Sequence, residues 1–506
     1  MATLAPAVVL GQSAPVVDTI AEATRLRDAK DFSAAATLLR PYADAHPDDA
    51  GSARFAALMT YWAKDYSLAD SVYARTLARH PDDAALRLEY ARFLLETSSI
   101  ARAREVLAPM LAPESTSFTP AEVARARTLR GTADYWSGDF TGARREFATA
   151  LRLDTSVTDA RRQLTEIETA AASWIRLGSA IWDDDQPLRH TTFDIEGGWF
   201  ASPLTPLVVR AGSTIFDQNQ TTETISTAEA EIKTYLPGAH VDLAVGGGLV
   251  ERSFGQASDW TARATLGARL PHTIKLYATF EREPYTLTVR SLGTSIMVRS
   301  IEGGARWGNP GTWMGELTAR RESYPDDNTV STAYAWILAP LLRRRTATVH
   351  AGYGFSSQSA DENRFTPRGD INIPPGQAPI TVPGEYNPYY TPKDLRVHSA
   401  LASMRVHPGG RWTFEGNARY ALSARDEAPV LVVAASPPNV VVTRGFYERS
   451  FTPWNARGSL DWAASESVRL GLGAEHGRGA YYEFTTARVQ LTYTFVAAAR
   501  RRADIH

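Results

Sequence analysis

The sequence predicts a multidomain chain in which an α-helical repeat region comes first and a long antiparallel β-region follows. Three observations predict this order. The first third repeats itself with a period of about 34 residues. From Trp174 onward the apolar residues change from a helical period to strict alternation. Within the alternating part, short and long connections between the segments also alternate.

The repeat places small residues at fixed positions. The letters HPDDA occur at residues 46–50 and again at 80–84. Two helices approach closely only where their side chains are small, and a large apolar residue then fills the gap to the next repeat. Two small residues and one large residue recur in this way at Ala23, Ala35 and Leu39, at Ala57, Ala69 and Tyr73, at Ala91, Ala103 and Leu107, and at Gly131, Ala143 and Phe147.

This pattern resembles the tetratricopeptide repeat, in about four copies between residues 16 and 157. Residues 158–172 are expected to form a capping helix. The resemblance implies an α-solenoid that binds a peptide or protein segment. The His-Pro-Asp-Asp turns recur at helix junctions, so they are interpreted as helix caps and not as metal sites.

The alternating part predicts membrane strands. About sixteen segments alternate, for example Val241, Leu243 and Val245 against Asp242 and Ala244. Most are ten or more residues long, whereas a soluble strand has about 5–6 residues and a tilted membrane strand needs about 9–11. Turns such as Pro237-Gly238 are short, and the intervening loops include two extended ones at 357–393 and 424–449. This topology predicts a transmembrane β-barrel of about 16 strands with periplasmic turns. The alternative is a soluble β-sandwich.

Four parts follow from these patterns. Residues 1–15 form a signal-like or disordered N-terminus. The tetratricopeptide region with its capping helix occupies 16–172, the outer-membrane barrel occupies 173–496, and a basic tail occupies 497–506. The last strand ends in Tyr493 and Phe495, which resembles the closing strand that the outer-membrane assembly machinery reads. We expect that machinery and outer-membrane lipid as partners, and a bacterial outer-membrane location with the repeat region in the periplasm.

Composition excludes several functions. The 54 basic and 56 acidic residues give no reason to expect a nucleic-acid partner. There is no cysteine, which excludes disulfides and a catalytic thiol. No nucleophile–base arrangement or phosphate-binding glycine loop stands out, so we expect no catalytic, cofactor-binding or metal-binding residues and no enzyme.

The polar residues of the alternating segments are expected to line the barrel. The candidates are Glu229, Glu231, Asp242, Arg263, Lys275, Glu281, Arg320, Glu415, Arg419, Arg469 and Glu475. Neither sign dominates, which favours a hydrated path for a neutral or weakly charged, hydroxyl-rich solute. The alternative is that these charges pair with each other and support the wall.

Three further groups are candidates for the barrel ends. Tyr386, Tyr389 and Tyr390 lie in a long loop that either gates the pore or holds a sugar, or is an ordinary surface loop. Asp183-Asp184-Asp185 is expected to be a solvated loop, with a calcium or sugar site as the alternative. The tryptophans near strand ends are interpreted as anchors at the membrane interface: Trp174, Trp182, Trp199 and Trp260.

A tetratricopeptide arm before a barrel resembles the bacterial exopolysaccharide export porins, such as those for cellulose and poly-N-acetylglucosamine. This resemblance implies an export porin that passes a polymer through the barrel while the arm docks a periplasmic protein or the secreted polymer. Two alternatives remain. One is a surface lipoprotein assembly modifier, and the other is a structural or adaptor barrel.

Overall fold

The computed structural model describes residues 18–112, 117–186, 188–218, 221–253, 258–271, 273–308, 312–368, 379–436 and 439–498. The expected N-terminal segment 1–15 lies outside these residues, as does the basic tail from residue 499. Contacts divide the chain into two compact units, one ending at Ile167 and the other beginning at Glu168. Each unit is described by itself.

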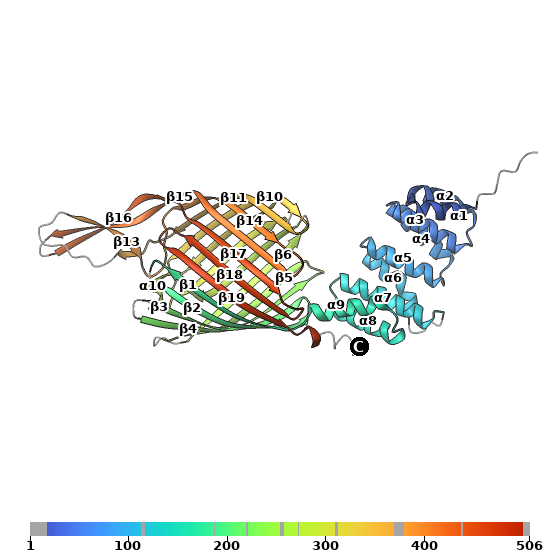
Figure 1. Cartoon of the computed structure of the whole chain (residues 1–506), viewed down its shortest axis with the longest axis horizontal. Helices are drawn as coiled ribbons and strands as arrows, with labels where there is room; N and C mark the ends of the chain where they lie inside the picture. Colours follow the sequence, from blue (N-terminus) through green and yellow to red (C-terminus); the bar gives the residue numbers. More distant parts are fainter. Residues whose placement is uncertain are drawn as a thin grey trace, which may run out of the picture. The chain divides into compact units, whose positions relative to one another are not determined.

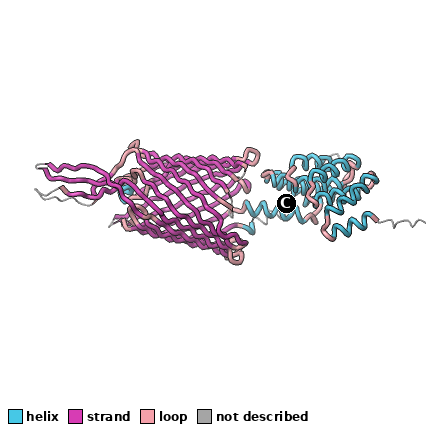
Figure 2. The backbone as a smooth tube through the Cα atoms, turned by 90° about the horizontal axis from the view of Figure 1, so that it is seen from above, coloured by secondary structure: helices cyan, strands magenta, loops and turns pink. Residues whose placement is uncertain are grey.

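The first unit is a helical solenoid (Figures 1 and 2). Antiparallel pairs form the four repeats, and a ninth helix follows within the described residues. The helices are α1 (Thr19–Asp28), α2 (Phe32–Ala45), α3 (Ala50–Trp62), α4 (Tyr66–Arg79), α5 (Ala84–Glu96), α6 (Ile100–Leu111), α7 (Pro120–Trp136), α8 (Phe140–Leu153) and α9 (Thr158–Ala170). The predicted tetratricopeptide region is therefore confirmed.

The recurring aspartates start these helices. The side chains of Asp31, Asp49, Asp65, Asp83 and Asp139 each accept a hydrogen bond from the backbone N–H three residues later. Such a cap satisfies one of the N–H groups that a helix leaves unpaired at its first turn. The capping interpretation of the repeated turns agrees with this geometry.

The small and large positions of the repeat form the solenoid core. Ala57 and Ala69 are fully buried beside Tyr73. Leu39, Leu107 and Phe147 are likewise fully buried at the equivalent position of the other repeats. The helices therefore approach each other closely at the alanines, and the large residues fill the gaps, at the positions that the sequence repeat predicts.

The second unit is a closed antiparallel barrel. Its sixteen strands within the described residues are β1 (Trp174–Asp184), β2 (Arg189–Ser202), β3 (Thr205–Gln218), β4 (Thr221–Leu236), β5 (Val241–Arg252), β6 (Asp259–Leu270), β7 (Ile274–Pro284), β8 (Met297–Trp307), β9 (Met314–Ser323), β10 (Thr329–Arg344), β11 (Ala347–Ala360), β14 (Leu395–Val406), β15 (Trp412–Ser436), β17 (Trp454–Ala463), β18 (Val468–Arg478) and β19 (Glu483–Thr494). Strand β1 pairs with β19 from Trp174↔Thr494 to Asp184↔Phe484, which closes the ring.

The two extended loops contain strands, which the sequence analysis did not expect. Strand β15 has 25 residues, and its second half pairs with β16 (Asn439–Phe451) and β13 (Ile380–Tyr386). Strand β12 (Phe365–Pro367) pairs with β13. The hairpin projects beyond the barrel end (Figure 1). The segment 424–449 was expected to be an extended loop, but its valine-rich runs have high β-propensity.

The described helices include none with both the length and the apolar character needed to cross a membrane.

One glycine of the solenoid tests its close packing. We expect Gly131→Ala to lower the free energy of unfolding of the helical unit by about 1–3 kcal/mol, because overpacking a tight contact forces neighbours to shift. A Cβ at residue 131 would lie 2.6 Å from the Phe147 ring. Thermal loss of the helical circular dichroism signal of the whole chain would measure the change.

Gly51→Ala is the matched control. Its Cβ would meet only the end of the Asp49 side chain, at 3.1 Å, and alanine is favoured over glycine in a helix by about 1 kcal/mol. An equal loss of stability in both variants would contradict the packing argument.

Candidate functional site: the barrel interior and its loop-side mouth

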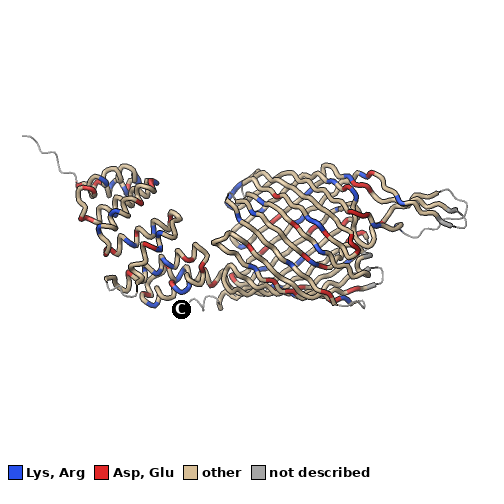
Figure 3. Tube along the Cα trace, turned by 180° about the vertical axis from the view of Figure 1, so that it is seen from behind, with Lys and Arg blue, Asp and Glu red and all other residues tan. Residues whose placement is uncertain are grey.

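The two faces of the barrel wall differ in chemistry. Leu177, Ile195, Leu266 and Leu317 belong to the outer face, where each is about half exposed. Residues next to them along the strands point inward and include most of the charged side chains. Figure 3 shows lysine, arginine, aspartate and glutamate interspersed over the barrel strands. The loop-side mouth is here the barrel end formed by residues 184–186, 188, 285–296, 324–328, 361–368, 379–394 and 479–482.

Inward charges on the first four strands form one continuous network. Glu196 accepts from Arg176 at 2.9 Å and from Arg210 at 2.8 Å. Arg210 also reaches Glu231 at 3.3 Å, and Glu231 pairs with Lys233 at 3.1 Å. Glu231 is thereby held by two cations although its side chain is almost fully buried.

A second group continues the pattern on β4 to β9. Asp242 pairs with Arg269 at 2.6 Å and with Lys275 at 3.1 Å. Glu229 accepts a hydrogen bond from Thr261 at 2.9 Å. Glu281 lies 2.8 Å from Arg263 and 4.0 Å from Arg320, and Arg320 also approaches Glu283 and Glu322.

The remaining wall candidates are less connected. Glu415 pairs with Arg405 at 2.6 Å, and Glu475 accepts from Asn455 at 3.0 Å. Arg469 forms no ion pair with a described residue. Arg419 donates to the hydroxyls of Ser399 and Ser356 and has no carboxylate partner within the described chain. The structure thus brings most candidates into short networks and leaves Arg419 and Arg469 outside them.

The loop tyrosines lie in the mouth. Tyr389 stacks on Tyr324 with ring centroids 3.6 Å apart, and its hydroxyl donates to Asp326 at 2.7 Å. The hydroxyl of Tyr285 accepts from the backbone N–H of Tyr390 at 3.0 Å. Tyr285 follows β7 and Tyr324 follows β9, so this segment is fixed to two other connections.

A second tyrosine cluster lies beside the first. Tyr386, Tyr390 and Tyr481 pack edge to face, with centroids 4.9 to 5.6 Å apart. The Tyr481 hydroxyl donates to Asp426 at 3.0 Å, and Asp426 receives two hydrogen bonds from Arg449. Burial raises the pKa of Tyr386 to about 12, so this hydroxyl remains protonated at neutral pH.

The connection between β7 and β8 also enters the mouth. It contains the short helix α10 (Val289–Leu292). Leu292 is buried in one cluster with Leu188, Phe216, Ile225 and Val250 from strands β2 to β5 and their connections. The Thr288 hydroxyl donates to the Pro388 carbonyl at 2.6 Å, which joins the two inserted segments. Connections that are distant around the ring therefore meet across this mouth.

Two tryptophan anchors were predicted on the wrong face. Trp182 stacks on Phe484 with centroids 4.4 Å apart and donates to Asp184 at 3.2 Å. Trp174 has the Arg176 guanidinium over its ring at 4.8 Å. Both lie an even number of residues from Arg176 along β1, so they share its inward-facing side of the strand. Proximity to a strand end does not indicate which face a residue occupies. Trp199 and Trp260 are about half exposed on the outer face.

Asp183 and Asp184 end β1 and Asp185 follows it, and all three hold local structure. Asp184 accepts from the backbone N–H groups of Gln186 and Leu188. Asp183 pairs with Arg189, and Asp185 accepts from the Glu483 N–H. The part of the chain that the structure describes contains no cluster of three potential metal-binding side chains.

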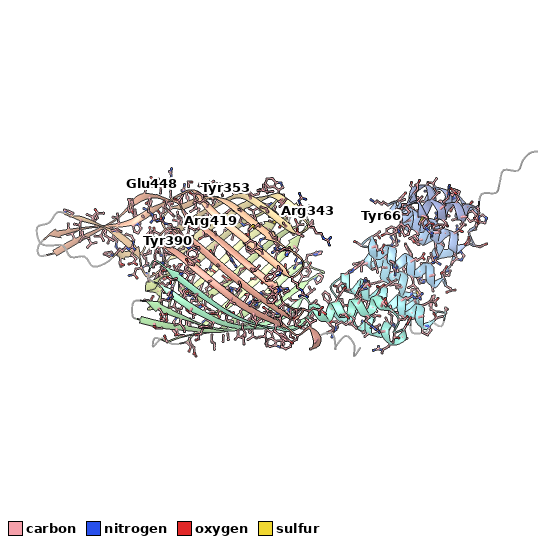
Figure 4. The ribbon with its side chains drawn as sticks, viewed as in Figure 1. Tyr66, Arg343, Tyr353, Tyr390, Arg419 and Glu448 are labelled. Carbon is pink, nitrogen blue, oxygen red and sulfur yellow. The ribbon has the colours of Figure 1, made fainter. Side chains whose placement is uncertain are left out.

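A cavity of about 450 Å³ lies at the base of the mouth. Its lining includes Tyr386, Tyr390 and Tyr481 of the mouth and the wall residues Ser356 and Arg419. Figure 4 labels Tyr390 and Arg419 at this end of the barrel. Sequence reasoning identified Tyr386, Tyr390 and Arg419 separately but missed Tyr285, Tyr324 and Tyr481, because only folding brings these distant connections together.

The comparisons with known proteins concern both units. The tetratricopeptide repeat family model matches residues 63–127. No curated protein matches the chain. A bacterial polysaccharide outer membrane secretin aligns with 64% of this chain and 99% of its own, at 9% identity and a TM-score of 0.46. CdiB from Acinetobacter baumannii aligns with 64% of this chain and 60% of its own, at 10% identity and a TM-score of 0.35. PilW, a type IV pilus biogenesis factor, aligns with 29% of this chain and 66% of its own, at 19% identity and a TM-score of 0.26.

The ion pair beneath the hairpin supports the mouth, which a substitution tests. In Asp426→Ala we expect the segment 379–394 to become susceptible to protease, because removing one partner of a buried pair costs about 3–5 kcal/mol. The Asp426 side chain is fully buried and that of Arg449 is 21% exposed.

Glu448→Ala removes a carboxylate from the same hairpin at the surface. The Arg425–Glu448 pair spans 3.5 Å with both side chains 70% exposed, so its loss should change little. Equal cleavage of the two variants would show that the buried pair does not hold the segment.

Proposed function

We propose that this chain is a non-enzymatic export porin of the bacterial outer membrane, which passes a hydroxyl-rich polymer, an exopolysaccharide, through its barrel. One observation carries the proposal. The wall is apolar outside and carries hydrogen-bonded charges inside, so it encloses a path that water can occupy. The helical unit is assigned to docking a periplasmic protein or the polymer, since solenoids present extended binding surfaces.

The orientation follows from the connections. Short turns join the strands at the end where β1 begins and β19 finishes. In outer-membrane barrels such turns face the periplasm and the long loops face outward. The repeat unit directly precedes β1 in sequence, so this orientation is consistent with a periplasmic repeat unit and an external loop-side mouth.

The mouth is interpreted as a gate in its closed position. The segment 385–391 is held by Tyr324, Tyr285 and Thr288 from other connections. Each of these contacts is a single stacked pair or hydrogen bond, worth about 0.5–1.5 kcal/mol. The bond from Tyr389 to Asp326 and the packing of Tyr386 and Tyr390 on Tyr481 also hold the segment, and polymer passage would require the release of these contacts.

A planar-bilayer measurement tests the pore. We expect the whole chain to show low conductance, and a variant in which residues 362–393 are replaced by a short glycine-serine linker to show several-fold higher conductance. Tyr389→Ala should raise the frequency of openings, because it removes both the stack on Tyr324 and the bond to Asp326.

Tyr353→Ala is the control for the point variant, since Tyr353 is 42% exposed on the outer face (Figure 4). It should conduct like the parent chain. A folded linker variant with no channel activity would rule out the pore.

A deletion strain tests the cargo class. Cells that lack this chain should retain exopolysaccharide in the periplasm, and the full-length gene should restore secretion. Normal secretion together with loss of a surface lipoprotein would instead identify an assembly modifier, and it would contradict the polymer assignment.

A further inference from the structure

The charge at the mouth cavity differs from that of the barrel wall. Among the described residues that border the cavity, Arg368, Arg419 and Arg478 are cationic and Glu385 is the one carboxylate. None of these three arginines forms an ion pair with a described residue. Elsewhere in the wall most of the candidate arginines are neutralised, Arg469 being an exception: Arg176, Arg210, Arg263, Arg269, Arg306, Arg320 and Arg405 each pair with a carboxylate.

Arg419 is held in place without being neutralised. Its Nε donates to Ser399 at 2.9 Å, and one terminal nitrogen donates to Ser356 at 3.2 Å. A guanidinium has five N–H donors in a planar fork, so three of them have no acceptor within the described chain. The serines fix the side chain while its charge stays available, which is the arrangement that a carboxylate ligand requires.

Aromatic side chains form another part of the cavity border. The rings of Tyr386, Tyr390 and Tyr481 pack at steep angles to one another. The Tyr390 hydroxyl is buried at this border and has no hydrogen-bond partner among the described residues. An aromatic face attracts the C–H groups of a sugar ring, and a free hydroxyl can bond its oxygens.

We infer that the mouth cavity is a binding site for an acidic saccharide unit, with Arg419 on the carboxylate and the tyrosine border against the sugar ring. This inference rests on the proposed export function and names the charge of its cargo. The wall as a whole favours a neutral or weakly charged solute, whereas the cavity selects for negative charge at the exit. Its volume of about 450 Å³ is within the range of small-molecule sites, about 300–1,000 Å³.

Calorimetric titration of the full chain in detergent tests the site. The probes are an oligouronate, a neutral oligoglucoside of equal length, a glucosamine oligomer and inorganic phosphate. We expect the oligouronate to bind most tightly and to weaken as salt rises, because the arginine charge is screened. Equal or tighter binding of the neutral or basic oligomer would overturn the inference. So would full competition by phosphate, which would indicate an anion site without sugar selectivity.

Substitutions locate the site. Arg419→Gln should weaken oligouronate binding about tenfold or more, as expected for losing a charge-assisted hydrogen bond. Tyr390→Phe, which removes only a hydroxyl, should weaken it by a smaller factor. Arg343→Gln removes the same charge at the opposite end of the barrel (Figure 4) and should leave affinity unchanged. An equal loss in Arg419→Gln and Arg343→Gln would overturn the assignment.

The two proposals fail separately. If the linker variant conducts but the chain does not distinguish acidic from neutral oligomers, the export function stands and the acidic site is wrong. Should Arg419→Gln fail to fold, Arg368→Gln provides the second test, since it removes a cavity charge that lies outside the barrel strands. Unchanged oligouronate affinity in Arg368→Gln would then contradict the site.

Discussion

Closure of the barrel by the pairing of β1 with β19 is the constraint on which the rest of the second unit depends. Lipid offers no hydrogen bonds, so an open sheet edge in a membrane would leave a row of backbone groups unpaired at several kcal/mol each. The register from Trp174↔Thr494 to Asp184↔Phe484 leaves no such edge. Closure also gives every strand an outer face and an inner face. Successive residues along a strand therefore alternate between an apolar outer position and a polar inner position.

The inner face then has to satisfy its own charges. A carboxylate such as Glu231, almost fully buried at the wall, is tolerated because Arg210 and Lys233 compensate it. Most of the pairs join neighbouring strands, so each one also fixes the position of a side chain that would otherwise extend into the path. The same ion pairs therefore both support the wall and provide a polar lining for a hydrated path. These two interpretations of the inward charges do not exclude each other.

The sequence predicted what repeats along the chain and missed what folding brings together. A fixed period located the helices, because Ala57, Ala69 and Tyr73 recur at equivalent places. Parity along β1 would have placed Trp174 and Trp182 inside, beside Arg176, but position near a strand end was given more weight. No local pattern connects Tyr324 with Tyr389, or Tyr481 with Asp426, since their separation in sequence is bridged only by the closed ring. The hairpin of β15 and β16 was missed because its valine-rich runs were included in an extended loop.

At the mouth, Arg449 is assigned a structural role, whereas Arg419 is assigned to ligand binding. Both are arginines near the same tyrosine border. Arg449 gives two hydrogen bonds to the fully buried Asp426, and losing that partner would leave a charge without compensation. Arg419 donates its side-chain hydrogen bonds only to hydroxyl oxygens, which orient a guanidinium but do not neutralise it. An oriented cation without a counter-charge beside a cavity is the feature from which we infer an anionic ligand.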